Sequence, residues 1–356
     1  MAKIQNVTLP YEALETIKKD VSDFSNAENK LTFNGILNTI ISKYSGKSKA
    51  DFSIVEKEQR DIISKALKDE DCEDSIKQKI SESLIKAYKS AFYAKMDAAV
   101  HGVSIKFGIN KDNCNDGEGY SILFNPAYDG YSTTSRYLSR LFESYAALKK
   151  SSREMIILSE TFDLIANAIE SKSILAITLE QGKRFLVKPY KIIEDPVTQN
   201  NYLISYGKPM QSNKKYAIFP YKISRICHAE IVSKGTGEIA KEEIKRIRIK
   251  LSGRSPSEIS NTPQKITIWM SEQGEHKYNS IIHNRPVIKY TGEKQILNGI
   301  NYKKYSCNCS LFQAKNYFLR LSNDAVITAP KKTFEEMKNT YIRAVSVYDS
   351  FSLNSE

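Results

Sequence analysis

Hydrophobic residues at the start of the chain follow the period of one strand and then of two helices. The pattern over residues 3–9 predicts a short strand that ends at Pro10, and Leu14 then opens an apolar stripe at helical spacing. Thr32 is suited to cap a second helix, whose apolar positions run to Tyr44. One strand and two short helices cannot close a hydrophobic core alone, so this unit needs a partner.

A similar pattern returns further along the chain. An alternating strand is predicted over residues 104–109, and a helix is predicted from Thr133. The segment between them contains Asn113, Gly117 and Gly119 and makes a poor helix, so the second copy is degenerate. The copies are either an internal repeat that supplies both halves of a ribbon, or unrelated elements with the same spacing by chance. The matching helix positions are Ile36 with Tyr137, Leu37 with Leu138, Ile40 with Leu141, Ile41 with Phe142 and Tyr44 with Tyr145.

The order of strand and helices, with its Val7-Thr8-Leu9-Pro10 ending, resembles the ribbon-helix-helix family. In that family two units pair their strands into an antiparallel ribbon that enters a nucleic-acid groove. Strand alternation would turn Val7 and Leu9 inward. The helical insert over residues 51–99 is expected to be a connector or a dimerisation surface. The weaker candidates for nucleic-acid contact, on the outer ribbon face, are Lys3, Asn6, Thr8, Ser104 and Lys106.

From Ser173 onward, short runs of apolar residues separated by turn signals predict a small five-stranded barrel. The predicted strands cover residues 174–179, 185–190, 201–206, 216–219 and 221–231. Three of them, Phe185–Tyr190, Asn201–Tyr206 and Tyr221–Ile226, resemble the successive signatures of the WYL domain, an SH3-like (Sm-like) β-barrel. A lead-in helix over residues 152–169 also resembles this family. The chain departs from the Trp-Tyr-Leu triplet at Asn201, which replaces the Trp.

The WYL resemblance implies binding of nucleic acid or a nucleotide-like ligand through basic and aromatic residues of the barrel. Lysine and arginine neutralise phosphates, and tyrosine rings offer stacking faces for single-stranded bases. The alternative for each tyrosine is a place in the barrel core with its hydroxyl hydrogen-bonded. Residues that match the family by position are Lys188, Tyr202, Lys222 and Arg225, and the weaker candidates are Arg184, Tyr190, Tyr206, Lys215 and Tyr221.

The last hundred residues alternate strands and helices in the order βαββαβ, followed by a final helix. This order predicts a ferredoxin-like domain. The segments Asn284–Pro286 and Tyr317–Ile327 resemble the C-terminal extension that often follows WYL domains. In that family the extension assists ligand binding or dimerisation, which makes Arg285 a candidate contact. Its alternative is a structural arginine paired with a carboxylate.

Charge is distributed unevenly along the chain. The formal net charge is +12, of which residues 1–150 contribute +1, residues 151–260 contribute +6 and residues 261–356 contribute +5. The barrel segment interleaves its basic residues with Phe and Tyr. This composition suits a surface that attracts phosphate chains, but it also suits an ordinary solvated surface with aromatic residues in the core.

Several classes of protein are not expected from the sequence. No apolar run approaches the roughly 18 residues of a membrane span, and the N-terminus lacks the order of a signal peptide, so a cytoplasmic protein is expected. Five cysteines and four histidines show no zinc spacing. Walker, nucleophile-elbow and dinucleotide motifs are absent, and paired carboxylates for a metal nuclease are lacking. The sequence therefore favours a binding protein without a cofactor over an enzyme.

The whole arrangement predicts an α+β multidomain chain with domains over residues 1–150, 151–260 and 261–356. It resembles the ribbon-helix-helix/WYL accessory proteins of type VI-D CRISPR systems. That resemblance implies single-stranded RNA binding, homodimerisation and stimulation of an RNA-guided CRISPR effector nuclease, with no catalysis by this chain. The main alternative is a transcriptional repressor whose ribbon reads duplex DNA and whose barrel senses a nucleotide or nucleic-acid ligand. A third possibility is a structural dimer with a merely solvated basic face.

Overall fold

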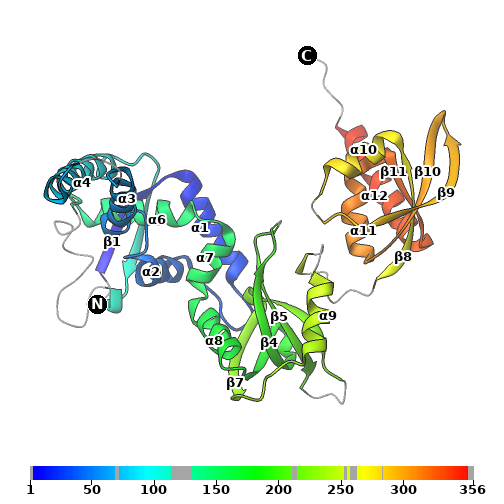
Figure 1. Ribbon diagram of the computed structural model, residues 1–356, viewed down its shortest axis with the longest axis horizontal. Coiled ribbons are helices and arrows are strands. Elements are labelled where there is room, and N and C mark those ends of the chain that lie inside the picture. The colour runs from blue at the N-terminus through cyan, green and yellow to red at the C-terminus, as the bar shows by residue number, and fades with distance from the viewer. Residues whose placement is uncertain are drawn as a thin grey trace.

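The described part of the chain consists of three antiparallel sheets and the helices packed on them (Figure 1). The mixed α+β composition expected from the sequence is confirmed. None of the helices in the described part of the chain combines the length and apolar character needed to cross a membrane. The computed structural model describes residues 3–68, 72–113, 130–196, 198–210, 215–251, 255–256, 263–282 and 284–351.

The two ribbon strands pair within the chain. β1 (Lys3–Leu9) runs antiparallel to β2 (Val103–Ile109), with Asn6 opposite Lys106. Because side chains alternate along each strand, one face of the ribbon is buried and the other is open to solvent. The buried side chains are those of Val7, Leu9, Phe107 and Ile109.

Helices α2 (Phe33–Tyr44) and α6 (Thr134–Ala146) border this ribbon in equivalent ways. Their N-caps, Thr32 and Thr133, each accept a hydrogen bond from the backbone N–H three residues later. Polar side chains at matching positions of the two helices then donate hydrogen bonds to backbone carbonyls of the two strands. Asn38 Nδ2 donates to the Gly108 carbonyl (2.9 Å), and Ser139 Oγ donates to the Thr8 carbonyl (2.7 Å). The structure thus gives residues of the two sequence copies the same structural tasks.

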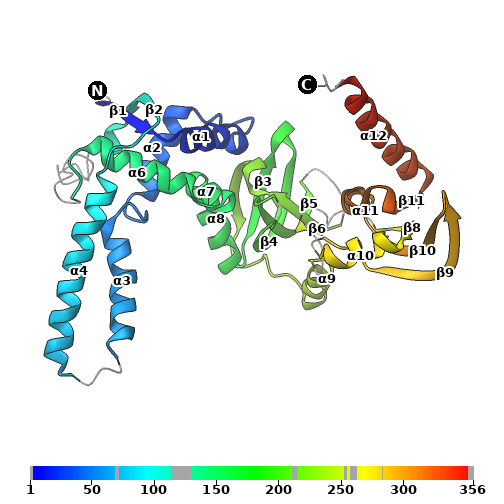
Figure 2. The same cartoon turned by 90° about the horizontal axis from the view of Figure 1, so that it is seen from above.

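The helical insert forms a hairpin that projects from the rest of the N-terminal region (Figure 2). It consists of α3 (Phe52–Ala66) and α4 (Asp74–Met96), which share a small core around Phe52 and Phe92. Apolar residues farther along α4, such as Leu84, are exposed. The expected break at Gly117 and Gly119 lies outside the described residues.

A five-stranded sheet follows, with strand order β6-β5-β4-β3-β7. The single strand expected over residues 221–231 is wrong, because a 3₁₀ turn over Ile223–Arg225 interrupts it. That turn carries the chain from one edge of the sheet to the other, since β6 and β7 lie at opposite edges. The strands are β3 (Ile174–Leu179), β4 (Arg184–Glu194), β5 (Asn201–Pro209), β6 (Ala217–Lys222) and β7 (Ile226–Ser233).

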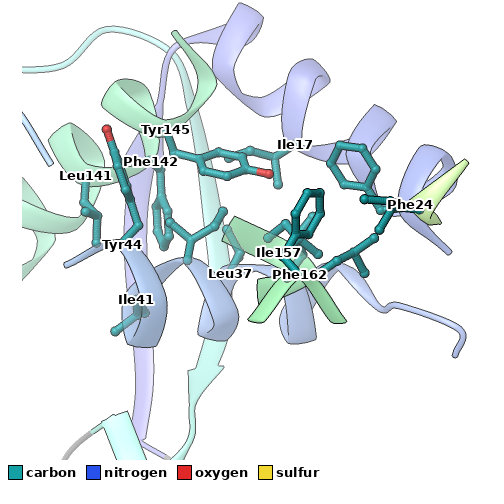
Figure 3. Close-up of a cluster of buried hydrophobic side chains, with 14 of the residues drawn as sticks. Ile17, Phe24, Leu37, Ile41, Tyr44, Leu141, Phe142, Tyr145, Ile157 and Phe162 are labelled. Carbon is teal, nitrogen blue, oxygen red and sulfur yellow. The ribbon is translucent and has the colours of Figure 1, made fainter. Parts of the chain in front are cut away.

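One hydrophobic core runs from the ribbon into this sheet without a break. Figure 3 shows its centre, where α1 (Tyr11–Phe24), α2 and α6 meet the two helices that precede the sheet. The expected lead-in helix is divided at Leu158 into α7 (Lys150–Ile157) and α8 (Ser159–Glu170), both of which bury apolar residues in this core. The hydrophobic core therefore continues across the domain boundary that the sequence predicts after residue 150.

Two consecutive residues of α7 connect the N-terminal helices to the sheet. Arg153 forms a bidentate ion pair with the fully buried Asp20 of α1 (2.7 and 3.1 Å), and Tyr145 Oη donates to the same carboxylate (2.9 Å). Burial, followed by the Asp20 charge, raises the pKa of Tyr145. Glu154, also fully buried, accepts from the backbone N–H groups of Asn201 (2.8 Å) and Ser224 (3.1 Å). We call these two residues and their partners the α7 joint.

The C-terminal region forms a four-stranded sheet of order β11-β8-β10-β9. Its core lies on one face, between the sheet and the helices. The elements are β8 (Gln264–Ser271), α10 (Glu272–Ser280), β9 (Ile288–Leu297), β10 (Ile300–Cys309), α11 (Leu311–Phe318), β11 (Ala325–Ala329) and α12 (Lys331–Ser350).

Breaking the α7 joint should strongly destabilise the protein. We expect Asp20→Ala to lower the free energy of unfolding by about 3–5 kcal/mol, because it leaves a largely buried guanidinium without its carboxylate. Glu15→Ala on the same helix removes only an exposed pair with Lys18 and should cost less than about 1 kcal/mol. Urea unfolding of the two variants measures the difference, and equal losses would contradict this role for Asp20.

Candidate nucleic-acid interface

Three of the residues expected to bind nucleic acid meet at the end of the sheet near α7. Tyr202 on β5 lies directly opposite Lys222 on β6, and Arg225 follows in the 3₁₀ turn. Lys150, at the start of α7, is close enough to influence the pKa of Lys222. We call Lys150, Tyr202, Lys222 and Arg225 the joint-side cluster.

Lys222 is half-buried among charges of its own sign. Burial lowers its pKa most, and Lys150 and Arg225 lower it further, while Glu154 and Asp23 act in the opposite direction. Lys150 pairs with Asp23 (2.7 Å) and Arg225 pairs with Glu180 (2.5 Å). Within the part of the chain that the structure describes, the ammonium group of Lys222 makes no hydrogen bond or ion pair of its own. A bound anion would stabilise the charged form of Lys222.

The buried Glu154 holds the start of β5, next to Tyr202 of the joint-side cluster, in place. Its Oε2 accepts from both the backbone N–H and the side-chain amide of Asn201 (2.8 and 2.9 Å), and this amide also donates to the Ser151 carbonyl (2.8 Å). Asn201 occupies the position at which the chain departs from the Trp-Tyr-Leu triplet, and its small buried amide makes contacts that an indole could not make. Burial raises the pKa of Glu154 despite these hydrogen bonds.

A second group of the expected residues lies farther along the same sheet face. Lys188 on β4 is opposite Tyr206 on β5, and the Tyr206 ring stacks on Tyr216 with centroids 5.5 Å apart. The ammonium groups of Lys188 and Lys208 lie 5.8 and 5.2 Å from the centroid of the Tyr216 ring. We call these four residues the tyrosine-side cluster.

Two further cations that were expected to bind nucleic acid lie at the margin of this sheet. Arg184 begins β4 and pairs with Glu230 (3.4 Å) in an exposed contact, and Lys215 is exposed. Lys188 also donates to the Glu238 carbonyl (2.9 Å), which fixes its position above the sheet.

Helix α9 (Lys241–Leu251) packs between the two clusters, and sequence reasoning missed it. Its Ile247 covers Ile204, which lies between Tyr202 and Tyr206 on β5. Tyr206 is four positions after Tyr202, so the clusters are about 13 Å apart along the strand. The spacing of Ile244, Ile247 and Leu251 could have indicated the helix.

Basic side chains of α9 add to the same surface. Lys245, Arg246 and Arg248 are exposed, and Arg248 Nε donates to the hydroxyl of Tyr190 (3.3 Å), another expected site residue. The two clusters and α9 therefore form one basic face with tyrosines at both ends, and Lys150, Lys208 and Tyr216 were not among the residues expected there.

Two of the expected residues do not belong to this face. The side chain of Tyr221 is buried in the main core against Phe185 and Phe219, where burial raises its pKa. Arg285 lies in the C-terminal region, with its guanidinium 5.2 Å from the centroid of the Tyr278 ring. It donates to the Tyr278 and Asn279 carbonyls near the end of α10, so its contacts are with backbone and not with the expected carboxylate.

The outer face of the ribbon carries little charge. Asn6, Ser104 and Lys106 are exposed and Thr8 is half-buried, while the Lys3 side chain lies outside the described residues. Among the described side chains of this face, Lys106 is the one cation. A phosphate backbone would find few contacts here.

Comparison with known proteins gives a fold but no family. No family model matches the sequence, and no curated protein matches it. Eight chains of solved structures match. A protein described as CRISPR Cas-related, known from a crystal structure, is 22% identical with a TM-score of 0.73 and covers 99% of this chain and 95% of its own. The chain thus shares its fold with that protein over nearly its whole length.

A second match is to the proteasome accessory factor B/C (PafBC) of Arthrobacter aurescens. It is 12% identical with a TM-score of 0.30, covering 62% of this chain and 33% of its own. This likeness is too low to support an argument about either fold or function.

The buried Glu154 should make stability depend on pH. Its raised pKa means that the folded protein holds the carboxyl proton more tightly than the unfolded chain does. The protonated Glu154 therefore adds to the free energy of unfolding at pH values below its ordinary pKa of 4.5. This contribution is lost as the pH rises through the raised pKa. We expect the free energy of unfolding of the wild type, relative to Glu154→Gln, to fall as the pH rises from below 4.5 through the raised pKa of Glu154. Urea unfolding across this range measures it, and a constant difference would contradict the shift.

Proposed function

We propose that this chain is a non-catalytic protein that binds single-stranded RNA through the basic face formed by the two clusters and α9. The observation that carries the proposal is the half-buried Lys222, which lies directly opposite Tyr202 and whose ammonium group makes no ion pair in the described part of the chain. Lys150 and Arg225 are already paired with Asp23 and Glu180, so Lys222 is the cation of this cluster that an RNA phosphate can pair with.

The tyrosines support a single strand over a duplex. Tyr202, Tyr206 and Tyr216 are half-buried beside the cations of the face, and unpaired bases can stack on the parts of their rings that remain open to solvent. Bases in a duplex are already stacked and present mainly phosphates to such a surface. The tyrosine hydroxyls could reach a ribose 2′-OH, which favours RNA over DNA.

We further propose that the chain acts as an accessory protein of a type VI-D CRISPR system, with a ribbon-helix-helix-like region, a WYL barrel and a ferredoxin-like domain. Two observations support this: the fold shared with a CRISPR Cas-related protein and the WYL-like segments of the sequence. In this role the protein works as a homodimer and stimulates the RNA-guided RNase effector.

One observation favours the alternative of a DNA-binding repressor. The ribbon is complete within one chain and turns Asn6, Thr8, Ser104 and Lys106 outward, as a groove-reading ribbon would. Its low charge argues against it as the main binding surface, because phosphate contacts supply most of the affinity for duplex DNA.

Neutralising the joint-side cluster should weaken RNA binding. We expect Lys222→Gln/Arg225→Gln to bind single-stranded RNA at least tenfold more weakly and to lower the slope of log affinity against log salt by about 1.4, or 0.7 for each lost phosphate contact. Glutamine is preferred to glutamate because a new carboxylate beside Glu154 would also destabilise the fold. Fluorescence anisotropy at several salt concentrations measures both quantities.

Asn6→Ala/Thr8→Ala is the matched control, since it changes two residues of the ribbon face and leaves the barrel intact. It should leave RNA affinity unchanged. Unaltered RNA affinity in the Lys222/Arg225 variant, with loss in the ribbon variant, would refute the assignment to the barrel and favour the ribbon.

A further inference from the structure

One face of the C-terminal sheet carries the chain's single tryptophan and is not part of the domain core. Ile266, Ile268 and Met270 of β8 point into the core with α11 and Met337 of α12. Trp269 alternates with them and therefore faces the opposite side of the sheet. The core of this domain is built without the indole ring. Figure 1 shows α10 and α11 on the other side of the strands.

Trp269 is half-buried between the two neighbouring strands. Lys304 on β10 and Val326 on β11 lie directly opposite it, and the Lys304 ammonium is 5.7 Å from the centroid of the indole ring. Lys265 and Lys289 are exposed on the same face: Lys289 of β9 lies opposite Ser306 of β10, and Lys265 lies opposite Asn308 of the same strand. The face thus combines a large aromatic surface with three lysines.

The acid that opposes these cations is Glu293. It pairs with Lys304 through both carboxylate oxygens, at 2.8 and 2.7 Å, in a contact that is partly open to solvent. Among the described side chains on this face, the three lysines outnumber this one carboxylate. An anionic partner is therefore electrostatically favoured over a cationic or neutral partner.

We propose that this face is a second contact surface for single-stranded RNA, on which one base stacks on Trp269 while the exposed Lys265 and Lys289 neutralise the adjoining phosphates. A four-stranded sheet with helices on one side and aromatic residues on the other is a general arrangement for binding unpaired bases. Stacking of a base on such a ring is sequence-tolerant, so no particular RNA sequence is required. The inference rests on the proposed RNA binding and adds to it a place where a base is held.

The single tryptophan makes a direct test possible with the unmodified protein. Titration with unlabelled oligouridylate should quench the indole emission and protect it from acrylamide, over the same concentration range in which a labelled oligouridylate shows binding by anisotropy. Binding by anisotropy with unchanged emission and acrylamide access would overturn this inference and leave the proposed function intact. Absence of binding in both measurements would instead refute the proposed function.

Variants give an independent test. Trp269→Leu should weaken binding about five- to a hundredfold, the usual range for one lost base stack, whereas Trp269→Phe should retain most of it. Phe312→Leu is the matched control, because Phe312 is an exposed aromatic residue on α11 of the same domain. Equal affinity of Trp269→Leu and the wild type would contradict the stacking site, as would equal losses in Trp269→Leu and Phe312→Leu.

Discussion

The arrangement of the first 250 residues depends on a pair of buried charges on one short helix. Arg153 reaches back to Asp20 and Glu154 reaches forward to Asn201 and Ser224, so α7 holds the N-terminal helices and the five-stranded sheet in a defined relation. Ionic groups without water need well-aligned partners, which restricts the geometries in which the two parts can pack. The continuous apolar core around α7 supplies the rest of the cohesion.

The same helix gives the basic face its electrostatic character. Glu154 is committed to the hydrogen bonds of the α7 joint, and Asp23 is paired with Lys150, so neither carboxylate forms a direct ion pair with Lys222. The lysine keeps a lowered pKa because it is half-buried beside other cations. Structural constraint and candidate binding chemistry therefore arise from neighbouring residues, and an RNA phosphate would give Lys222 the direct ion pair that Asp23 and Glu154 do not form with it.

Much of the fold could be predicted because periodicity reports directly on burial. The two ribbon strands and the helices capped by Thr32 and Thr133 were visible as alternating and helical patterns. The site was harder to predict, because contacts depend on which strands become neighbours. Tyr221 and Lys222 are adjacent in sequence, yet strand alternation places the first in the core and the second on the basic face. The position of Lys150 beside Lys222 follows only from the docking of α7.

The most direct test of the proposed function is a side-by-side titration of the full chain, at one near-physiological salt concentration, with single-stranded RNA, single-stranded DNA, duplex RNA and duplex DNA of matched length. Binding through a basic face that carries half-buried tyrosines predicts the highest affinity for single-stranded RNA. The highest affinity for duplex DNA would contradict the account, because it would move the main activity to the ribbon.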